Sequence, residues 1–261
     1  MTDPTTDTMK VLVLHFDAPL MSFGAPIVDQ NGVIQPYPAL SMLTGMVGNA
    51  LGLDHSEFDR LQRLQERLQY AVREDKQGRK IQDYQTVDLS KPYMDDDRAW
   101  TTRGELETRK GGSASSGTHI RERDYWAESA YTVLLTLDSP AETPTLDVVS
   151  SALQHPERPL FIGRKPCLPA LPMHVTCMTA DDWGDALKHA PRPRRRDDPD
   201  DFSSRCRVWW PTRPAAGRPE DGADRKPVTD QRDWANQIHT GERWIAHDTL
   251  LINSPSSHGS R

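Results

Sequence analysis

Two short apolar runs constrain the fold of this chain more than any other feature. Residues 10–16 read KVLVLHF and residues 131–137 read YTVLLTL. Runs of this length that are rich in Val and Leu are typical of strands buried within a sheet. The sequence therefore predicts a sheet whose buried strands come from distant parts of the chain.

The rest of the chain shows helical spacing or strand alternation of its apolar residues, which predicts further helices and strands. Apolar residues recur at helical spacing after Pro38, which suits the first position of a helix, and Gly52 follows as a C-terminal cap. A second amphipathic helix is predicted from Ser56, a good N-cap, to Val72. The other predicted elements are strands over residues 81–89 and 173–178 and a helix over residues 146–154.

The order of these elements predicts the fold class. Strand, helix, helix, strand, insertion, strand, helix, loop and strand suit an α+β sandwich of the ferredoxin-like kind, with helices on one sheet face and the other face free. We expect this domain to span residues 9–180. Residues 181–261 are charged and rich in Pro, which predicts an extension that is partly loop or disordered, with short strands or one helix at its Trp-containing pieces.

A basic insertion rich in Gly and Ser interrupts the pattern at residues 90–123. It is too long for an ordinary connection, and such loops are usually functional or disordered. It couples the cationic or titratable residues Arg103, Arg109, Lys110, His119, Arg121 and Arg123 with the aromatic residues Trp100, Tyr125 and Trp126. Cations beside flat rings suit single-stranded RNA, although a solvated hairpin of mixed charge would have the same composition.

Two other places offer contacts to an anion. Gly163 permits a backbone turn that approaches a ligand closely, and Arg164 and Lys165 place charge beside it. A basic surface turn would contain the same three residues. The predicted helix start, which includes Ser41 and Thr44, offers free N–H groups and a favourable dipole to a phosphate.

Composition narrows the other classes of function. The chain of 261 residues has a formal net charge of −6, yet its cations cluster, so a basic groove on an acidic body is compatible with it. The 3 cysteines are widely spaced and the 9 histidines are scattered, which argues against a disulfide framework and against a metal site. Because no catalytic motif or nucleotide-binding fingerprint stands out, we expect neither a cofactor nor catalysis.

The N-terminal segment and the hydropathy predict the compartment. The segment MTDPTTDTMK is polar and acidic and has no apolar leader region. No stretch approaches the ~18 apolar residues needed to span a bilayer. We therefore expect a cytoplasmic protein.

Five segments between residues 9 and 177 share, in order, the motifs of one known family. They are KVLVLHFDAPLMSFGAP with its Phe23-Gly24 pair, PYPALSMLTGMVGNALGL, DYQTVDL, RDYWAESAYTVLL and RPLFIGRKPCLPALP. In these motifs the chain resembles the CasD subunit family of the type I-E CRISPR Cascade complex, within the RAMP superfamily.

The resemblance implies a RAMP domain with a protruding β-hairpin thumb, which the insertion would form. It also implies a subunit that holds the 5′ handle of CRISPR RNA without cutting it and that contacts the CasC backbone subunit and the CasA large subunit. The cations would then hold phosphates, whereas Phe23 and Tyr125 would stack or pack. The residues expected along the RNA are Phe23, Gly24, Ser41, Thr44, Arg109, Lys110, Arg121, Arg123, Tyr125, Gly163, Arg164 and Lys165.

Two other functions remain compatible with these residues. One is a metal-independent endoribonuclease that processes precursor CRISPR RNA, with His119 or His15 as general acid or base. The other is a protein–protein interaction module whose cations bind acidic partners, and it predicts no salt-dependent affinity for RNA.

Overall fold

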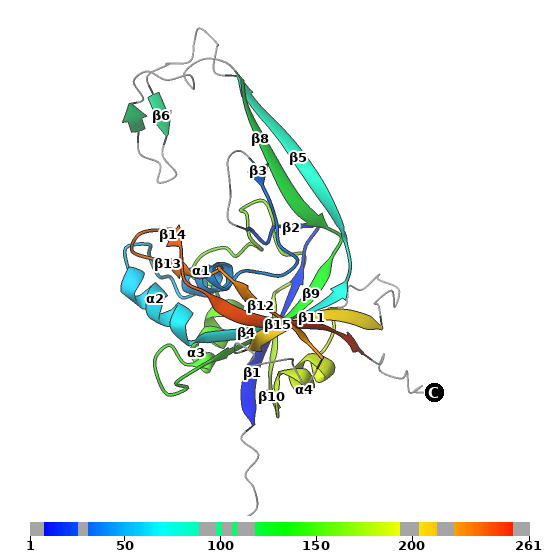
Figure 1. Cartoon of the computed structure of the whole chain (residues 1–261). Helices are drawn as coiled ribbons and strands as arrows, with labels where there is room; N and C mark the ends of the chain where they lie inside the picture. Colours follow the sequence, from blue (N-terminus) through cyan, green and yellow to red (C-terminus); the bar gives the residue numbers. More distant parts are fainter. Residues whose placement is uncertain are drawn as a thin grey trace, which may run out of the picture.

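A seven-stranded antiparallel sheet forms the centre of the chain (Figure 1). The computed structural model describes residues 8–25, 31–88, 98–100, 106–108, 118–193, 204–212 and 222–252. The strands, in their order across the sheet, are β10 (His174–Ala180), β1 (Met9–Asp17), β9 (Ala130–Leu137), β4 (Leu68–Lys76), β11 (Arg205–Thr212), β15 (Arg243–Leu251) and β12 (Asp224–Val228). The two apolar runs predicted as buried strands are thus confirmed as β1 and β9, which lie side by side.

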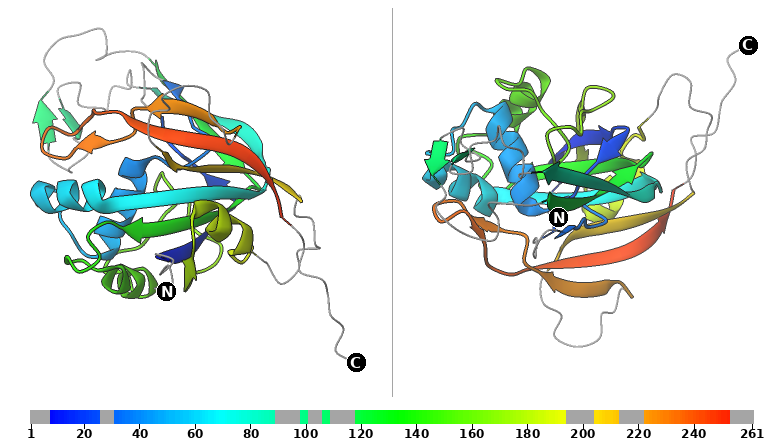
Figure 2. Two further views of the ribbon diagram at one scale, coloured as in Figure 1. Left: turned by 60° about the horizontal axis from the view of Figure 1, so that its bottom comes forward. Right: turned by 90° about the horizontal axis from the view of Figure 1, so that it is seen from above.

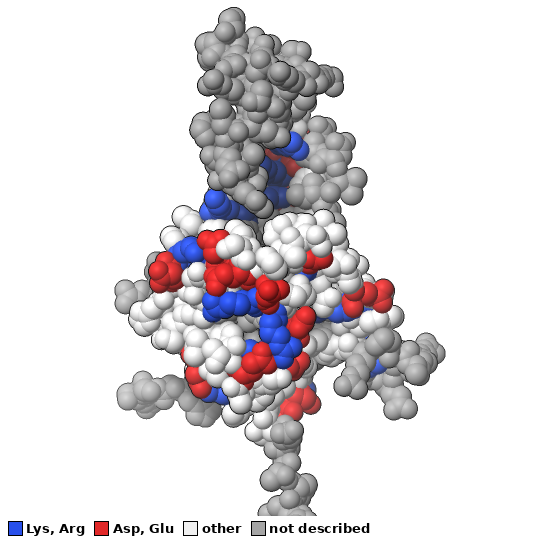
Figure 3. Space-filling view, turned by 90° about the vertical axis from the view of Figure 1, so that its left-hand side faces the viewer, with Lys and Arg blue, Asp and Glu red and all other residues white. Residues whose placement is uncertain are grey.

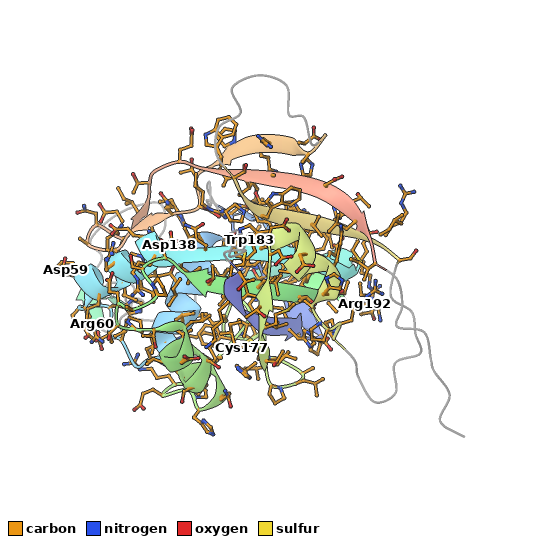
Figure 4. All side chains as sticks on the ribbon, turned by 90° about the horizontal axis from the view of Figure 1, so that it is seen from below. Asp59, Arg60, Asp138, Cys177, Trp183 and Arg192 are labelled. Atoms are coloured by element: carbon orange, nitrogen blue, oxygen red, sulfur yellow. The ribbon has the colours of Figure 1, made fainter. Side chains whose placement is uncertain are left out.

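Helices cover both faces of this sheet. The helices are α1 (Leu40–Ala50), α2 (Phe58–Arg67), α3 (Leu146–Gln154) and α4 (Trp183–His189). Leu12 and Leu14 of β1 face the main core with α1 and α3, whereas Val11 and Val13 face a second core that α4 closes. Figure 4, seen from below, shows α4, with Trp183 at its start, over this second face. The expectation of a free sheet face is therefore wrong, because the apolar side chains on both faces of β1 require cover.

The predicted second helix ends five residues early. It stops at Arg67, and Leu68 begins β4, which pairs with β9 and β11 in the middle of the sheet. Leu68 and Val72 are four residues apart, a spacing that fits one face of a helix and one face of a strand equally well. The N-cap of α2 is Glu57 rather than the predicted Ser56. The strand β4 was not predicted from the sequence.

Close packing between α1 and α2 leaves little room for a side chain at Gly48. A Cβ atom on Gly48 would lie 2.6 Å from the Leu61 side chain of α2. Gly52 has a φ of +75° and follows the C-cap residue, which confirms its predicted role at the helix end. The helix begins at Leu40 with Ala39 as its N-cap, so Pro38 lies just before the helix and not at its first position.

A long antiparallel pair, β5 (Arg79–Asp88) and β8 (Thr118–Ala127), projects from the body (Figure 1). The short strands β2 (Leu20–Met21) and β3 (Asn31–Gly32) pair with β8 near its base. Two further short pairs are β6 (Arg98–Trp100) with β7 (Leu106–Thr108), and β13 (Arg232–Asp233) with β14 (Ile238–His239). The pair β5–β8 therefore flanks the inserted segment that the sequence marked as unusual.

The C-terminal region contributes to the central sheet. Figure 2 shows β11, β15 and β12, coloured yellow to red, continuing the sheet beyond β4 in cyan. The short strands expected at the Trp-containing pieces are thus confirmed. The sheet crosses residue 180, and the division into residues 9–180 and an extension stays a prediction.

Candidate nucleic-acid interface

An open groove lies between α1, the loop of residues 158–165 and the β13–β14 hairpin. Its volume is about 980 Å³. Five of the twelve residues expected along the RNA contribute to its lining, and they are Gly24, Ser41, Gly163, Arg164 and Lys165. The structure thus brings together residues that lie far apart in the sequence. Figure 3 shows Lys and Arg side chains where the body meets the projecting part of the chain, whereas charges of both signs share the surface below.

Gly163 is required by the packing of the chain itself. Its φ is +94°, and a Cβ atom on it would lie 1.8 Å from the carbonyl oxygen of Ser22. The neighbouring backbone is also bonded there, because the Ser22 N–H donates to the Ile162 carbonyl at 3.1 Å. The close approach expected of Gly163 therefore occurs, but its partner is the Ser22 backbone and not a ligand.

Replacing Gly163 with alanine is expected to lower the free energy of unfolding by about 1–3 kcal/mol, because the left-handed backbone and the contact with Ser22 both disfavour a side chain. Urea denaturation followed by tryptophan fluorescence measures the change. Gly24→Ala is the matched control, since nothing lies within 4 Å of a Cβ atom at Gly24. Equal stability of the two variants would contradict this role of Gly163.

Arg164 anchors the loop to the base of the projecting strands. Its Nη1 donates to the Asp124 carbonyl at 2.7 Å, and its Nη2 donates to the Gly32 carbonyl at 2.9 Å. The guanidinium carbon lies 4.9 Å from the centre of the Tyr125 ring, a cation–π geometry. Arg164 is therefore partly committed to structure, and the adjacent Lys165 is the exposed cation of the loop.

Three residues expected at the RNA have at most 3 % of their surface exposed. Phe23 has no exposed surface and packs on the rings of Phe16 and Tyr131. Thr44 is also fully buried, and its hydroxyl donates to the Leu40 carbonyl. Tyr125 is 3 % exposed beneath Arg164. Of the alternatives for Phe23 and Tyr125, packing is what the structure shows, since neither ring has a face open to a base.

The start of α1 is already occupied by a carboxylate of the chain. The Leu40 N–H donates to Oδ2 of Asp230 at 3.0 Å, and the Ser41 N–H donates to the Asp230 carbonyl oxygen at 3.0 Å. Asp230 is 1 % exposed. The expectation that a phosphate binds at this helix start is therefore wrong, because Asp230 takes the position that suits an anion.

Two of the remaining predicted cations, Arg121 and Arg123, lie on β8. Residues two apart in a strand share a face, so Arg121, Arg123 and Tyr125 lie on one face of β8, with Arg164 stacked on the last of them. Arg121 is exposed and Arg123 is half-buried. Arg109 and Lys110 lie outside the described residues. A row of cations thus leads along β8 toward the groove.

Sequence reasoning missed the groove residues that come from outside the predicted motifs. One wall is formed by the β13–β14 hairpin, and the missed lining residues with polar groups include Arg232, Trp234 and His239. No motif or periodicity marks these positions. An isolated tryptophan within a charged stretch was the one available signal.

The histidine considered as a catalytic group lies away from the groove. His15 shares the face of β1 that carries Val11 and Val13, which is the face under α4. One ring nitrogen lies 2.9 Å from the Pro191 carbonyl oxygen, and burial lowers the pKa of the imidazole. The side chain of His119 is outside the described part of the structure. His15 thus belongs to the opposite side of the sheet.

Metal and membrane signals were searched within the described residues. No three His, Cys, Asp or Glu side chains gather there as they would around a metal ion. No helix in those ranges has the length and apolar character needed to cross a membrane.

Comparisons with known proteins point in one direction. The sequence pattern of the family described as CRISPR-associated protein (Cas_Cas5) matches residues 11–246. The CRISPR system Cascade subunit CasD of Escherichia coli (strain K12) is 27 % identical over 183 residues, which cover 69 % of this chain and 77 % of the relative.

Two solved structures share the fold. A chain of a structure titled CRISPR RNA-guided surveillance complex gives a TM-score of 0.63 at 23 % identity and covers 95 % of both chains. A structure titled Crystal structure of Cas protein gives a TM-score of 0.53 at 19 % identity, covering 92 % of this chain and 95 % of the other. Since the family pattern spans most of the chain, from β1 into β15, the protein belongs to the CRISPR-associated Cas5 family.

Proposed function

We propose that this chain is a subunit of a type I-E Cascade complex that holds the 5′ handle of CRISPR RNA and does not cut it. Membership in the Cas5 family supports the assignment to a CRISPR system, and the likeness to CasD supports the choice of Cascade. The observation that carries the proposal is the groove lined by Lys165 and Arg164, which Arg164 joins to β8 through Asp124 and Tyr125.

The fold supports the proposal through its topology. The strand order β10, β1, β9 and β4, with α1 and α3 on one face, is the arrangement expected of a ferredoxin-like RAMP domain. The pair β5–β8 would be the stem of the thumb, and the inserted residues that include Arg109 and Lys110 would form its outer part. RNA would then pass between this thumb and the body.

The electrostatics suit a holding role. Lys165 is exposed at the groove, and Arg121 is exposed on β8. Cations that contact successive phosphates supply affinity without reading the bases. His15, half-buried on the far side of the sheet, is unsuited to act on RNA in the groove. We expect the CasC and CasA subunits to contact the surface that surrounds the bound handle.

Neutralising Lys165 is expected to weaken RNA binding about tenfold and to reduce the slope of log affinity against log salt by about 0.7, the contribution of one phosphate contact on a single strand. Fluorescence anisotropy with labelled repeat-derived RNA that carries the handle, at several salt concentrations, measures both. Lys188→Gln is the matched control, because Lys188 is an exposed lysine on α4, across the sheet from α1.

A denaturing gel of the same samples separates the alternative functions. Intact RNA with salt-sensitive binding supports the holding role, whereas site-specific cleavage without metal would favour an endoribonuclease. Absence of RNA binding by the unmodified chain would instead favour a protein–protein interaction module. Equal affinity of the Lys165→Gln and Lys188→Gln variants would remove Lys165 from the interface.

A further inference from the structure

Arg232 and Trp234 place unused hydrogen-bond donors in the wall of the groove. Both residues line it from the β13–β14 hairpin, and the Arg232 guanidinium lies 5.3 Å from the centre of the indole ring. Nε of Arg232 and Nε1 of Trp234 are buried and have no hydrogen-bond partner in the described structure. Leaving a buried donor unpaired destabilises the free chain, and a bound acceptor would relieve that penalty.

The charge of Arg232 is also uncompensated. Among the described residues, no carboxylate forms an ion pair with it, and its Nη2 donates to the neutral amide of Gln237. Burial lowers the pKa of this guanidinium, and no neighbouring acid opposes that effect. Partly buried arginines are normally paired with an anion. The Arg232 guanidinium therefore has no anionic partner among the described residues.

The backbone beneath Arg232 is held firmly in place. The Arg232 N–H donates to Oε1 of Gln65 at 3.0 Å, and Nε2 of Gln65 donates to the Arg232 carbonyl at 2.9 Å. Gln65 lies on α2 and is 3 % exposed. At the turn, the Asn236 N–H donates to Oδ1 of Asp233 at 2.9 Å. The backbone of the hairpin is thus held by bonds other than that of the Arg232 side chain to Gln237, which leaves the guanidinium able to change partner.

We propose that Arg232 binds a backbone phosphate of the RNA, on the wall of the groove that the β13–β14 hairpin forms. The C-terminal hairpin thereby completes the RNA site, to which the loop of residues 158–165 and β8 also contribute. Turning the guanidinium away from Gln237 toward the phosphate pairs its free donors. This inference rests on the proposed function.

RNA fits this position better than an acidic peptide does. Arg164 lines the groove beside Lys165 and contacts Asp124 and Tyr125 of β8, so the groove lies next to the strand that carries Arg121. A ligand with a regular series of negative charges can therefore meet Arg232, Lys165 and the cations of β8. A guanidinium also matches the two terminal oxygens of a phosphodiester, with which it forms paired hydrogen bonds. A single carboxylate of a peptide would pair with only one of these cations.

Arg232→Gln is expected to weaken binding of the labelled handle RNA about tenfold, the effect of losing one charge-assisted contact, and to lower the salt slope by about 0.7. Arg232→Lys keeps the charge and is expected to retain the slope while losing part of the affinity. Arg60→Gln is the matched control, because Arg60 is an exposed arginine of α2 whose Nη1 bonds Glu57 outside the groove. Far-UV circular dichroism verifies that each variant is folded.

The outcomes separate this inference from the proposed function. If Lys165→Gln weakens binding while Arg232→Gln matches the unmodified chain in affinity and slope, the RNA role stands and the Arg232 contact is overturned. That result would point to an acidic segment of a partner protein as the ligand of Arg232. If the unmodified chain binds no RNA at any salt concentration, both proposals fall together.

Discussion

Replacing Asp230 with alanine is expected to lower the free energy of unfolding by about 3–5 kcal/mol, the usual cost of removing one partner from a buried ion pair. Nε and Nη2 of Arg243 donate to the two carboxylate oxygens of Asp230 at 2.7 and 2.6 Å. Asp230 also accepts the bond from the Leu40 N–H at the start of α1. The substitution therefore leaves a buried guanidinium without its anion and a helix without its cap.

A hydroxyl in the same cluster adds to this dependence. Tyr70 donates to the Pro38 carbonyl at 2.6 Å, and the Arg243 guanidinium stacks on its ring at 4.7 Å. Burial raises the pKa of Tyr70 above its ordinary value, so the hydroxyl keeps its proton at neutral pH. Tyr70 thus cannot replace the missing negative charge when Asp230 is removed.

A double-mutant cycle tests the origin of the loss. Asp230→Asn retains an acceptor for the Leu40 N–H and is expected to cost less than Asp230→Ala. Arg243→Met combined with Asp230→Ala removes both charges, so the pair of substitutions is expected to cost less than the sum of the single ones. Urea denaturation measures the free energy of unfolding of the unmodified chain, the three single variants and the double variant. An Asp230→Ala chain that unfolds at the midpoint of the unmodified chain would contradict the role of this ion pair.

The elements that could be predicted from sequence are those whose apolar pattern has one interpretation. Residues 146–154 form the predicted helix with unchanged bounds, capped by the Thr145 side chain. The strand β4 was missed because its buried Arg73 and Asp75 hide the alternation, and because Leu68 and Val72 fit a helix as well. Polar residues that pair with each other inside a core carry no signature in a single sequence.

The site shows the same division. The Gly163-Arg164-Lys165 turn was identified because a local motif carries it, and the structure places it in the groove. The contacts of its residues differ from the predicted ones. Gly163 packs against the Ser22 backbone and Arg164 donates to backbone carbonyls, whereas both were predicted to contact a ligand. Another wall comes from residues 231–239, whose contribution depends on long-range sheet pairing of β15 with β11 and β12. Such pairing is a property of the whole fold and leaves no local pattern.

Replacing Arg73 with methionine is expected to lower the free energy of unfolding by about 3–5 kcal/mol. Arg73 has no exposed surface, and its Nε donates to Asp75 at 2.7 Å. Its other nitrogens donate to the hydroxyl of Thr132 and to the carbonyls of Leu187, Ala190 and Pro191. Burial already raises the pKa of the Asp75 carboxyl despite the nearby guanidinium, so without Arg73 this carboxyl is expected to bind a proton more readily.

Arg73 joins the end of α4 to the sheet, so its replacement is expected to loosen this end of the helix before the whole chain unfolds. Arg192, labelled in Figure 4, reaches the same carboxylate, with its Nε 3.8 Å from Asp75, and is too distant to replace the lost bonds. Hydrogen exchange is therefore expected to rise first in residues 183–192. Asp147→Ala is the contrasting control: it breaks the Lys10–Asp147 pair, whose side chains are 48 % and 75 % exposed, and should cost less than about 1 kcal/mol. A similar loss from both substitutions would show that burial does not set the strength of the Arg73–Asp75 pair.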